Sequence, residues 1–136
     1  MDRDEAIEFL RDHHRSVLAT RRSDGGVQLS PVVHALDAEG RVMISTREPA
    51  MKVRNVRRDG QAWLCVLNDR FFGGWAQAEG PVDVVALPEA MPLLEDVYRA
   101  VAGEHPDWED FRAAMERERR VVLRITVERV GPTVSG

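Results

Sequence analysis

The segment between residues 45 and 58 contains the residues best suited to bind an anion. It holds five basic residues and one acidic residue, although the whole chain has a net charge of −4. A predicted strand delivers Ser45 and Thr46 to the start of a predicted helix, where N–H groups are unpaired and the helix dipole is positive. Lys52 and Arg54 add positive charge within the first two turns. These features predict a cradle for one or two phosphate-like groups, and a solvated cationic helix face is the alternative.

A second candidate is the sequence Gln-Leu-Ser-Pro-Val at residues 28–32, inside a predicted strand. Pro31 cannot donate a hydrogen bond to a sheet ladder, so it indicates an edge or a bulge at this point. A bulge would leave backbone groups unpaired, and these could contact the edge of a flat heteroaromatic ring. The simpler alternative is an ordinary edge strand.

Other residues have suitable chemistry, but a structural role fits each of them better. Trp75 follows a Gly-Gly pair and could close over a ligand, or it could pack in a core or an interface. His34 is a candidate proton donor or a partly buried structural histidine. The Glu-His-Pro-Asp sequence at residues 104–107 resembles a set of metal ligands, but its turn residues indicate a surface loop, so we predict no metal site. Cys65 is predicted to be a small core residue.

The elements that position these residues follow from the spacing of apolar side chains. Alternating segments bounded by turn residues predict strands at residues 17–20, 27–36, 41–46, 61–67, 75–87 and 121–130. Helical spacing predicts helices at residues 4–13, from Pro49 to a stop at Gly60, and at residues 88–101 and 108–118. Short links between six strands indicate an antiparallel barrel with peripheral helices.

Three of these elements carry more specific expectations. On the helix that follows Pro49, Val53 and Val56 should face inward, with the polar residues over the other side: Lys52, Arg54, Asn55 and Arg58. The strand at residues 61–67 is apolar on both faces, so it needs cover from its own fold or from a partner subunit. The strand at residues 75–87 should bend at Gly80.

Length and composition limit the class of protein. The chain has 136 residues, of which 43% are apolar and 31% charged, and this predicts a single globular domain over residues 1–136. We find no apolar run of the roughly 20 residues that a membrane span needs, and the charged N-terminus does not resemble a signal peptide. The single cysteine fits a reducing cytoplasm. The acidic balance argues against general binding to nucleic acid or an anionic membrane.

Taken together, several segments resemble a known family. They are residues 28–32, residues 44–59 with a Lys-x-Arg-Asn motif, residues 78–80, residues 98–108 with a Gly-Glu-His-x-Asp-Trp motif, and residues 119–123. These segments are similar to the flavin and deazaflavin split-barrel family, which contains the pyridoxamine 5′-phosphate oxidases and the coenzyme F420-dependent reductases. The two motifs resemble the F420-dependent branch typical of actinobacteria, and the 18 arginines beside one lysine agree with such a source.

The resemblance implies a mainly β fold, a six-stranded antiparallel split β-barrel of the pyridoxamine 5′-phosphate oxidase type. It also implies a homodimer with the cofactor at the interface. The phosphate and tail of F420 would be bound by Ser45, Thr46, Met51, Lys52, Arg54 and Asn55. The deazaflavin ring would be lined by Gln28, Ser30, Pro31 and Val32, and covered by Gly74 and Trp75.

The activity implied by the resemblance is hydride transfer from reduced F420 to a small unsaturated organic substrate, with no obligatory side-chain nucleophile. The alternatives are an FMN-binding relative, such as an oxidase, and an F420-binding module without turnover. The same phosphate cradle would serve all three. The expected partners are a small-molecule substrate and a second copy of the chain, with no metal, nucleic acid or membrane.

Overall fold

The computed structural model describes residues 1–132 of the chain. Its helices are α1 (Arg3–Asp12), α2 (Met51–Asp59), α3 (Met91–Ala102) and α4 (Trp108–Arg117). Its strands are β1 (Arg15–Arg21), β2 (Val27–Leu36), β3 (Val42–Arg47), β4 (Gln61–Leu67), β5 (Trp75–Val85), β6 (Arg120–Ile125) and β7 (Arg129–Gly131). The sheet order is β4-β1-β2-β3-β6-β5-β7, and a further pairing of β4 with β5 closes it.

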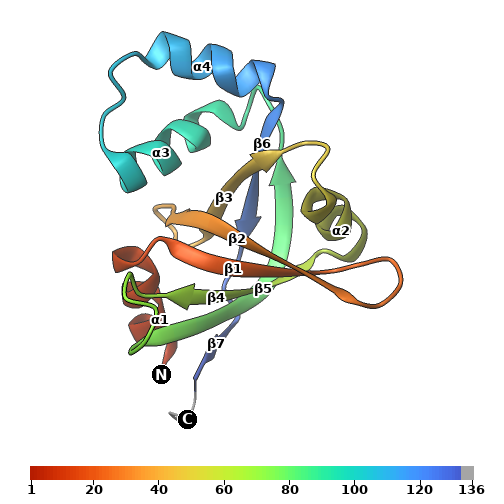
Figure 1. Cartoon of the computed structure of the whole chain (residues 1–136), viewed down its shortest axis with the longest axis vertical. Helices are drawn as coiled ribbons and strands as arrows, with labels where there is room; N and C mark the ends of the chain where they lie inside the picture. The colour runs from red at the N-terminus through yellow and green to blue at the C-terminus, as the bar shows by residue number, and fades with distance from the viewer. Residues whose placement is uncertain (133–136) are drawn as a thin grey trace.

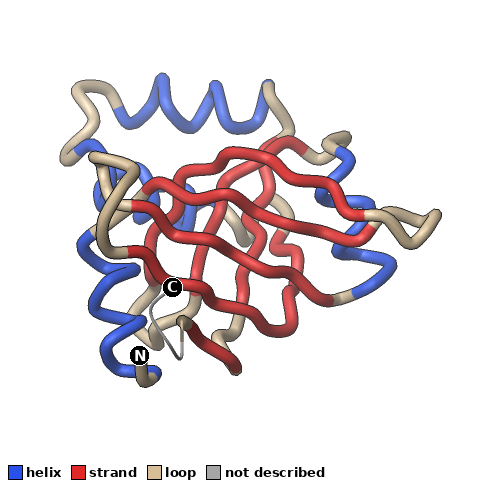
Figure 2. The backbone as a smooth tube through the Cα atoms, turned by 60° about the horizontal axis from the view of Figure 1, so that its bottom comes forward, coloured by secondary structure: helices blue, strands red, loops and turns tan. Residues whose placement is uncertain are grey.

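This arrangement confirms the predicted mainly β fold. All strand pairings are antiparallel, and together they form a barrel with helices at its periphery (Figure 1, Figure 2). The barrel has six strands when β6 and β7 are counted as two parts of the predicted last strand.

The last strand contains one extra residue between β6 and β7. Val82 of β5 pairs with Ile125, whereas Glu79 pairs with Arg129, so the register advances by one residue in between. The N–H groups of residues 126 and 128 both bond to carbonyl groups of β5, at 3.0 and 2.9 Å. The expectation of one continuous strand over residues 121–130 is therefore wrong, because a β-bulge turns the strand at this point.

Gly80 of β5 lies against this bulge. A β-carbon at position 80 would overlap the backbone carbonyl oxygen of Thr126. Packing therefore requires a glycine here, because any side chain would separate the two backbones.

Residues 27–33 of β2 form a free edge of the sheet. They pair with β1, with Pro31 opposite Val17, while β2 pairs with β3 only over residues 34–36. The register with β1 is continuous, so the predicted edge is confirmed and the alternative of a bulge is wrong. The N–H of His34 donates to the carbonyl of His14 at 3.0 Å. Because bonding alternates along an antiparallel pair, the nitrogen of Pro31 faces away from β1, and proline costs this ladder no bond.

Two of the helices begin later than predicted. Ala50 is the N-cap of α2, so Pro49 lies before the helix and not in its first turn. The predicted stop of α2 is confirmed, because Gly60 ends the helix in the left-handed conformation with a φ of 71°. α3 begins at Met91, three residues after the expected start. No helix within residues 1–132 is long and apolar enough to cross a membrane.

Two apolar clusters hold the elements together. The larger fills the barrel and includes Leu10 of α1 with Val53 and Val56 of α2. The smaller lies between the outer face of the sheet and the α3–α4 pair, which stands at one end of the barrel (Figure 1). The larger cluster therefore anchors the helix whose first turn carries Lys52.

Candidate functional site

The first turn of α2 has the features of an anion site. Its N-cap, Ala50, provides no side-chain oxygen to the first N–H groups, and its first turn contains no acidic residue. Lys52 is half-buried and Arg54 is exposed. Within residues 1–132 neither side chain forms an ion pair or a hydrogen bond. The helix start therefore offers N–H groups and two cationic side chains to a ligand.

The other three basic residues of this segment are engaged by the protein itself. Arg47 lies 3.8 Å from the carboxylate of Glu118, and Arg57 pairs with Glu48. Arg58 donates to a backbone carbonyl of β1 at 2.6 Å. The predicted cationic cluster is thus divided into a structural part and a part that is available to an anion.

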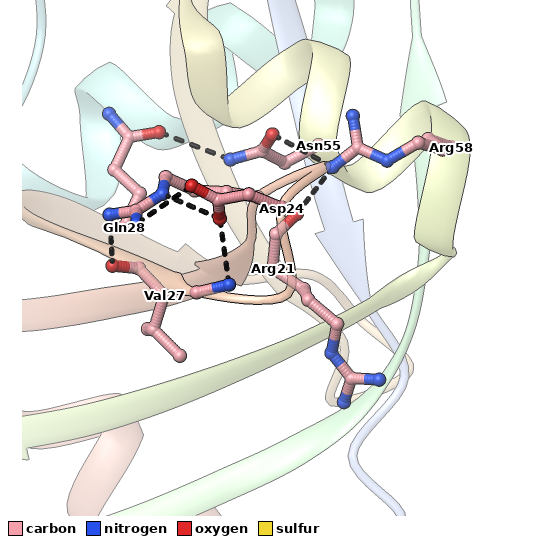
Figure 3. Close-up of polar contacts among 8 residues, drawn as sticks. Arg21, Asp24, Val27, Gln28, Asn55 and Arg58 are labelled. Carbon is pink, nitrogen blue, oxygen red and sulfur yellow. Dashed lines mark hydrogen bonds and ion pairs between the residues drawn. The ribbon is translucent and has the colours of Figure 1, made fainter.

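Asn55 is buried, with 1% of its surface exposed, although we expected it on the outer side of α2. Its Nδ2 donates to Thr20 Oγ1 at 3.1 Å and to Gln28 Oε1 at 3.2 Å. Its Oδ1 accepts a bond from Arg58 Nη2 at 3.1 Å (Figure 3). All of its polar atoms therefore have partners in the chain, and Asn55 ties α2 to β1 and β2.

The predicted ring-lining residues of β2 are divided between two faces. Gln28, Ser30 and Val32 are half-buried and lie on the face that points into the barrel, opposite residues 20, 18 and 16 of β1. Pro31 is exposed on the other face. It helps to line an open, mostly apolar groove of about 380 Å³, together with Arg15, Ser16, Val17, Val32, Val33 and Leu67.

Ser45 and Thr46 are also divided between faces, because they are neighbours on a strand. Thr46 is buried and pairs with Val121 of the barrel core. Ser45 pairs with Val122, which belongs to the cluster under α3 and α4. The structure therefore places only Thr46 on the side of the barrel interior. Met51 is exposed at the start of α2.

Gly74 and Trp75 lie at the start of β5, beside α1. Trp75 pairs with Leu67, which pairs with Arg15, so two strands separate Trp75 from β2. A β-carbon at Gly74 would lie 3.3 Å from Phe9 of α1. A single chain therefore does not bring these two residues to the start of α2.

His34 is fully buried, which excludes it as a proton donor to a substrate at the surface. Its Nε2 donates to the Leu10 carbonyl at 3.0 Å, and its Nδ1 accepts from the Ser16 hydroxyl at 2.5 Å. Burial lowers the pKa of His34 to about 4, so the ring is neutral at pH 7. Of the two roles considered for this histidine, the structure supports the structural one.

The loop at residues 104–107 is structural, as expected. Glu104 accepts bonds from Trp108 Nε1 and Arg99 Nε, both at 3.0 Å. Asp107 caps α4, and its N–H donates to His105 Nδ1 at 2.9 Å. No group of three or more His, Cys, Asp or Glu side chains in the part described could hold a metal ion.

Cys65 lies on the outer face of β4, half-buried, and not in the core as predicted. Trp63 and Leu67 share this face, while Leu64 and its neighbours on the other face fill the barrel. Burial raises the pKa of the Cys65 thiol.

Two partners of Asn55, Thr20 and Arg58, were not predicted from the sequence. Thr20 is 35 residues from Asn55 along the chain, so no local pattern connects them. Arg58 is within the basic segment, but nothing in the sequence separates its structural role from that of Lys52.

Comparison with known proteins gives a match over nearly the whole chain. The family model described as "Pyridoxamine 5'-phosphate oxidase" matches residues 3–133. A conserved hypothetical protein from Mycobacterium tuberculosis has a similar structure, with a TM-score of 0.78 and 22% identity over 100% of this chain and 93% of that chain. A structure named F420 reductase has a TM-score of 0.72 and 19% identity, over 91% and 94% of the two chains. For General Stress Protein 26 from Bacillus anthracis the values are 0.65 and 10%, over 93% and 89%. At these low identities, the TM-scores show a shared fold and nothing more specific.

Proposed function

The chain belongs to the pyridoxamine 5′-phosphate oxidase family, and from this premise we propose that it is an F420-dependent oxidoreductase that reduces a small unsaturated organic molecule. The observation that carries this proposal is the start of α2, where Lys52 and Arg54 have no partner within residues 1–132 beside an uncapped first turn. An anionic cofactor tail has the charge that this arrangement would stabilise. The fold similarity to an F420 reductase is consistent with it.

The residues present fit such a cofactor in two places. Lys52, Arg54 and the N–H groups of the first turn of α2 would hold the phosphate, with Met51 beside them. The free edge of β2 would receive the ring, because its backbone groups at residues 27–33 have no strand partner on that side. Asn55 would act through Gln28, since its own amide is already bonded. When bound, a reduced deazaflavin supplies the hydride.

The chain would contribute binding and orientation rather than an acid or a nucleophile. The edge of β2 would hold one side of the ring and leave the other open to a substrate. His34 cannot deliver a proton, because it is buried and bonded on both nitrogens. We therefore propose that water supplies the proton of the reduction.

An FMN-binding oxidase is the second candidate, and the description of the matching family model favours it. The same cradle suits the single phosphate of FMN. A cytoplasmic location stays a prediction for either function.

We also propose a homodimer that completes the site. Leu29 and Val33 on the outer face of β2 are 67% and 46% exposed. On the far side of β1 lie the apolar outer residues of β4, which need cover. In such a dimer the partner would supply Gly74 and Trp75, which one chain holds away from α2.

Binding of F420 and of FMN to the same preparation, followed by fluorescence, tests the proposed function. Micromolar or tighter binding of F420 with weaker binding of FMN is the expected result. The opposite preference would support the FMN candidate. Binding without reduction of any compound in a broad substrate panel would support a module without turnover. A protein that binds neither cofactor would contradict the proposal.

Replacing Lys52 with alanine should weaken F420 binding by about 1–3 kcal/mol, a roughly five- to 150-fold rise in Kd, because a charge-assisted bond to phosphate is lost. Fluorescence titration measures the change. Arg57→Ala is the matched control, because Arg57 lies on the same helix but is paired with Glu48. An unchanged Kd for Lys52→Ala would rule out this assignment.

Replacing Leu29 with arginine should convert the dimer to a monomer, since a charge would enter the apolar interface. Sedimentation velocity measures the change, with an expected rise in the dimer dissociation constant of about tenfold or more. Ala113→Arg is the control, because Ala113 is exposed on α4, which packs against α3 and β6. Equal behaviour of the two variants would place the interface elsewhere.

A further inference from the structure

Three polar side chains form a series of hydrogen bonds from the exposed side of α2 to the inner face of β2. Arg58 Nη2 donates to Asn55 Oδ1, and Asn55 Nδ2 donates to Gln28 Oε1, at 3.1 and 3.2 Å (Figure 3). We propose that this relay fixes the Gln28 amide with its nitrogen toward the cofactor, so that Gln28 donates to a carbonyl oxygen of the bound ring. The inference rests on the proposed function, because the ring is the ligand that Gln28 would address.

The direction of the relay is set at Arg58. A guanidinium group can only donate hydrogen bonds, so the Asn55 atom that faces it must be the oxygen. Arg58 is itself held in place, because the same Nη2 donates to the Arg21 carbonyl at 2.6 Å. The Asn55 nitrogen must then face the strands, where it donates to both Thr20 and Gln28.

The orientation of Asn55 in turn determines that of Gln28. Because Asn55 presents N–H, Gln28 must present its oxygen to it, and the Gln28 nitrogen is directed away from Asn55 (Figure 3). In residues 1–132 this nitrogen has no hydrogen-bond partner, although Gln28 is half-buried. An amide nitrogen that is directed away from Asn55 and has no acceptor in this part of the chain is free to donate to a ligand.

The chemical consequence is a preference for an acceptor at this position. Flavins and deazaflavins share a ring edge that carries carbonyl oxygens, and Gln28 lies on the free-edge strand that would meet the ring. Asn55 is therefore a positioning residue, which acts through Gln28, and Arg58 positions Asn55. A ring with a donor at the same place would be disfavoured, because two N–H groups would face each other.

The substitution Asn55→Asp tests the relay with almost no change in shape. An aspartate still accepts from Arg58, but it cannot donate to Gln28, so the Gln28 amide should turn and place its oxygen toward the ring. The Kd of F420, measured by fluorescence titration, should rise about tenfold in the wild-type background. In a Gln28→Ala background the same substitution should change the Kd less than twofold. An equal rise in both backgrounds, or no rise in either, would overturn the relay.

A measurement without cofactor separates this inference from the proposed function. In the ¹⁵N-labelled wild-type protein, side-chain amide protons of Gln28 should exchange rapidly with water, while those of Asn55 exchange slowly. In Asn55→Asp, the Gln28 amide should become slow to exchange, provided that the variant unfolds cooperatively. Slow Gln28 exchange in the wild-type protein would overturn the relay. Rapid exchange in a protein that binds neither F420 nor FMN would support the relay and contradict only the proposed cofactor.

Discussion

Alanine at position 80 should lower the free energy of unfolding by about 3 kcal/mol or more. An added β-carbon would overlap the carbonyl oxygen of Thr126, and this oxygen belongs to the backbone, so it cannot rotate away as a side chain would. Either β5 or the bulged strand would have to shift. The bonds from residues 126 and 128 to β5, at 3.0 and 2.9 Å, would then be weakened. Equilibrium unfolding in urea measures the loss.

A second glycine separates packing from backbone conformation. Gly60 has a φ of +71°, and a β-carbon there would have nothing within 4 Å. Gly60→Ala should therefore cost only the strain of a left-handed residue, about 1–2 kcal/mol. If Gly80→Ala were no less stable than Gly60→Ala, the close approach of the β5 backbone to Thr126 at the bulge would be contradicted.

Acidification from pH 7 to pH 4 should remove about 3 kcal/mol of stability through His34 alone. Burial lowers the pKa of His34 from 6.5 to about 4 in the folded protein. Between these values the unfolded chain binds a proton that the folded chain does not. The contribution of neutral His34 to the free energy of unfolding is therefore fully present above pH 6.5. It falls by about 1.36 kcal/mol for each pH unit as the pH decreases toward 4.

Urea unfolding of the wild-type protein and of His34→Gln at pH 7, 6, 5 and 4.5 measures this contribution. The curve for His34→Gln should be flatter over this range than the curve for the wild-type protein. Arg22 and Arg120 lower the carboxyl pKa values of Asp24 and Glu118 through hydrogen bonds, but these pairs are common to both proteins. Parallel curves for the wild-type protein and His34→Gln would contradict the role of His34.

The positions of the strands along the chain and the free edge could be predicted because local chemistry determines them. Alternation located most strands to within a few residues, and Pro31 indicated an edge because proline cannot donate to a ladder. The bulge at residues 126–128 could not be seen. Residues 121, 123, 125 and 127 are apolar in the sequence, so the alternation continues through residues 126 and 127 as if the strand were regular. The extra residue is visible only against β5.

The site was predicted unevenly for a related reason. Lys52 and Arg54 were found because a helix start with adjacent cations is a local pattern. Neighbouring residues on a strand point to opposite faces, so Ser45 and Thr46 cannot both face one ligand. The prediction that both bind the cofactor did not take this into account. Asn55 was placed on the wrong side of α2 because its partners, Thr20 and Gln28, come from distant strands. Whether an amide side chain is buried depends on its tertiary contacts, and helical spacing alone does not reveal these.

The free edge of β2 also affects how the protein behaves at high concentration. A strand edge left open for a ligand is equally open to a strand from another molecule, and such edges promote aggregation. The nitrogen of Pro31 faces this edge, so an incoming strand meets a gap in the donors at its centre. Pro31 therefore suits an edge beside the candidate ring site, and it also protects the chain from uncontrolled pairing of this edge with other molecules.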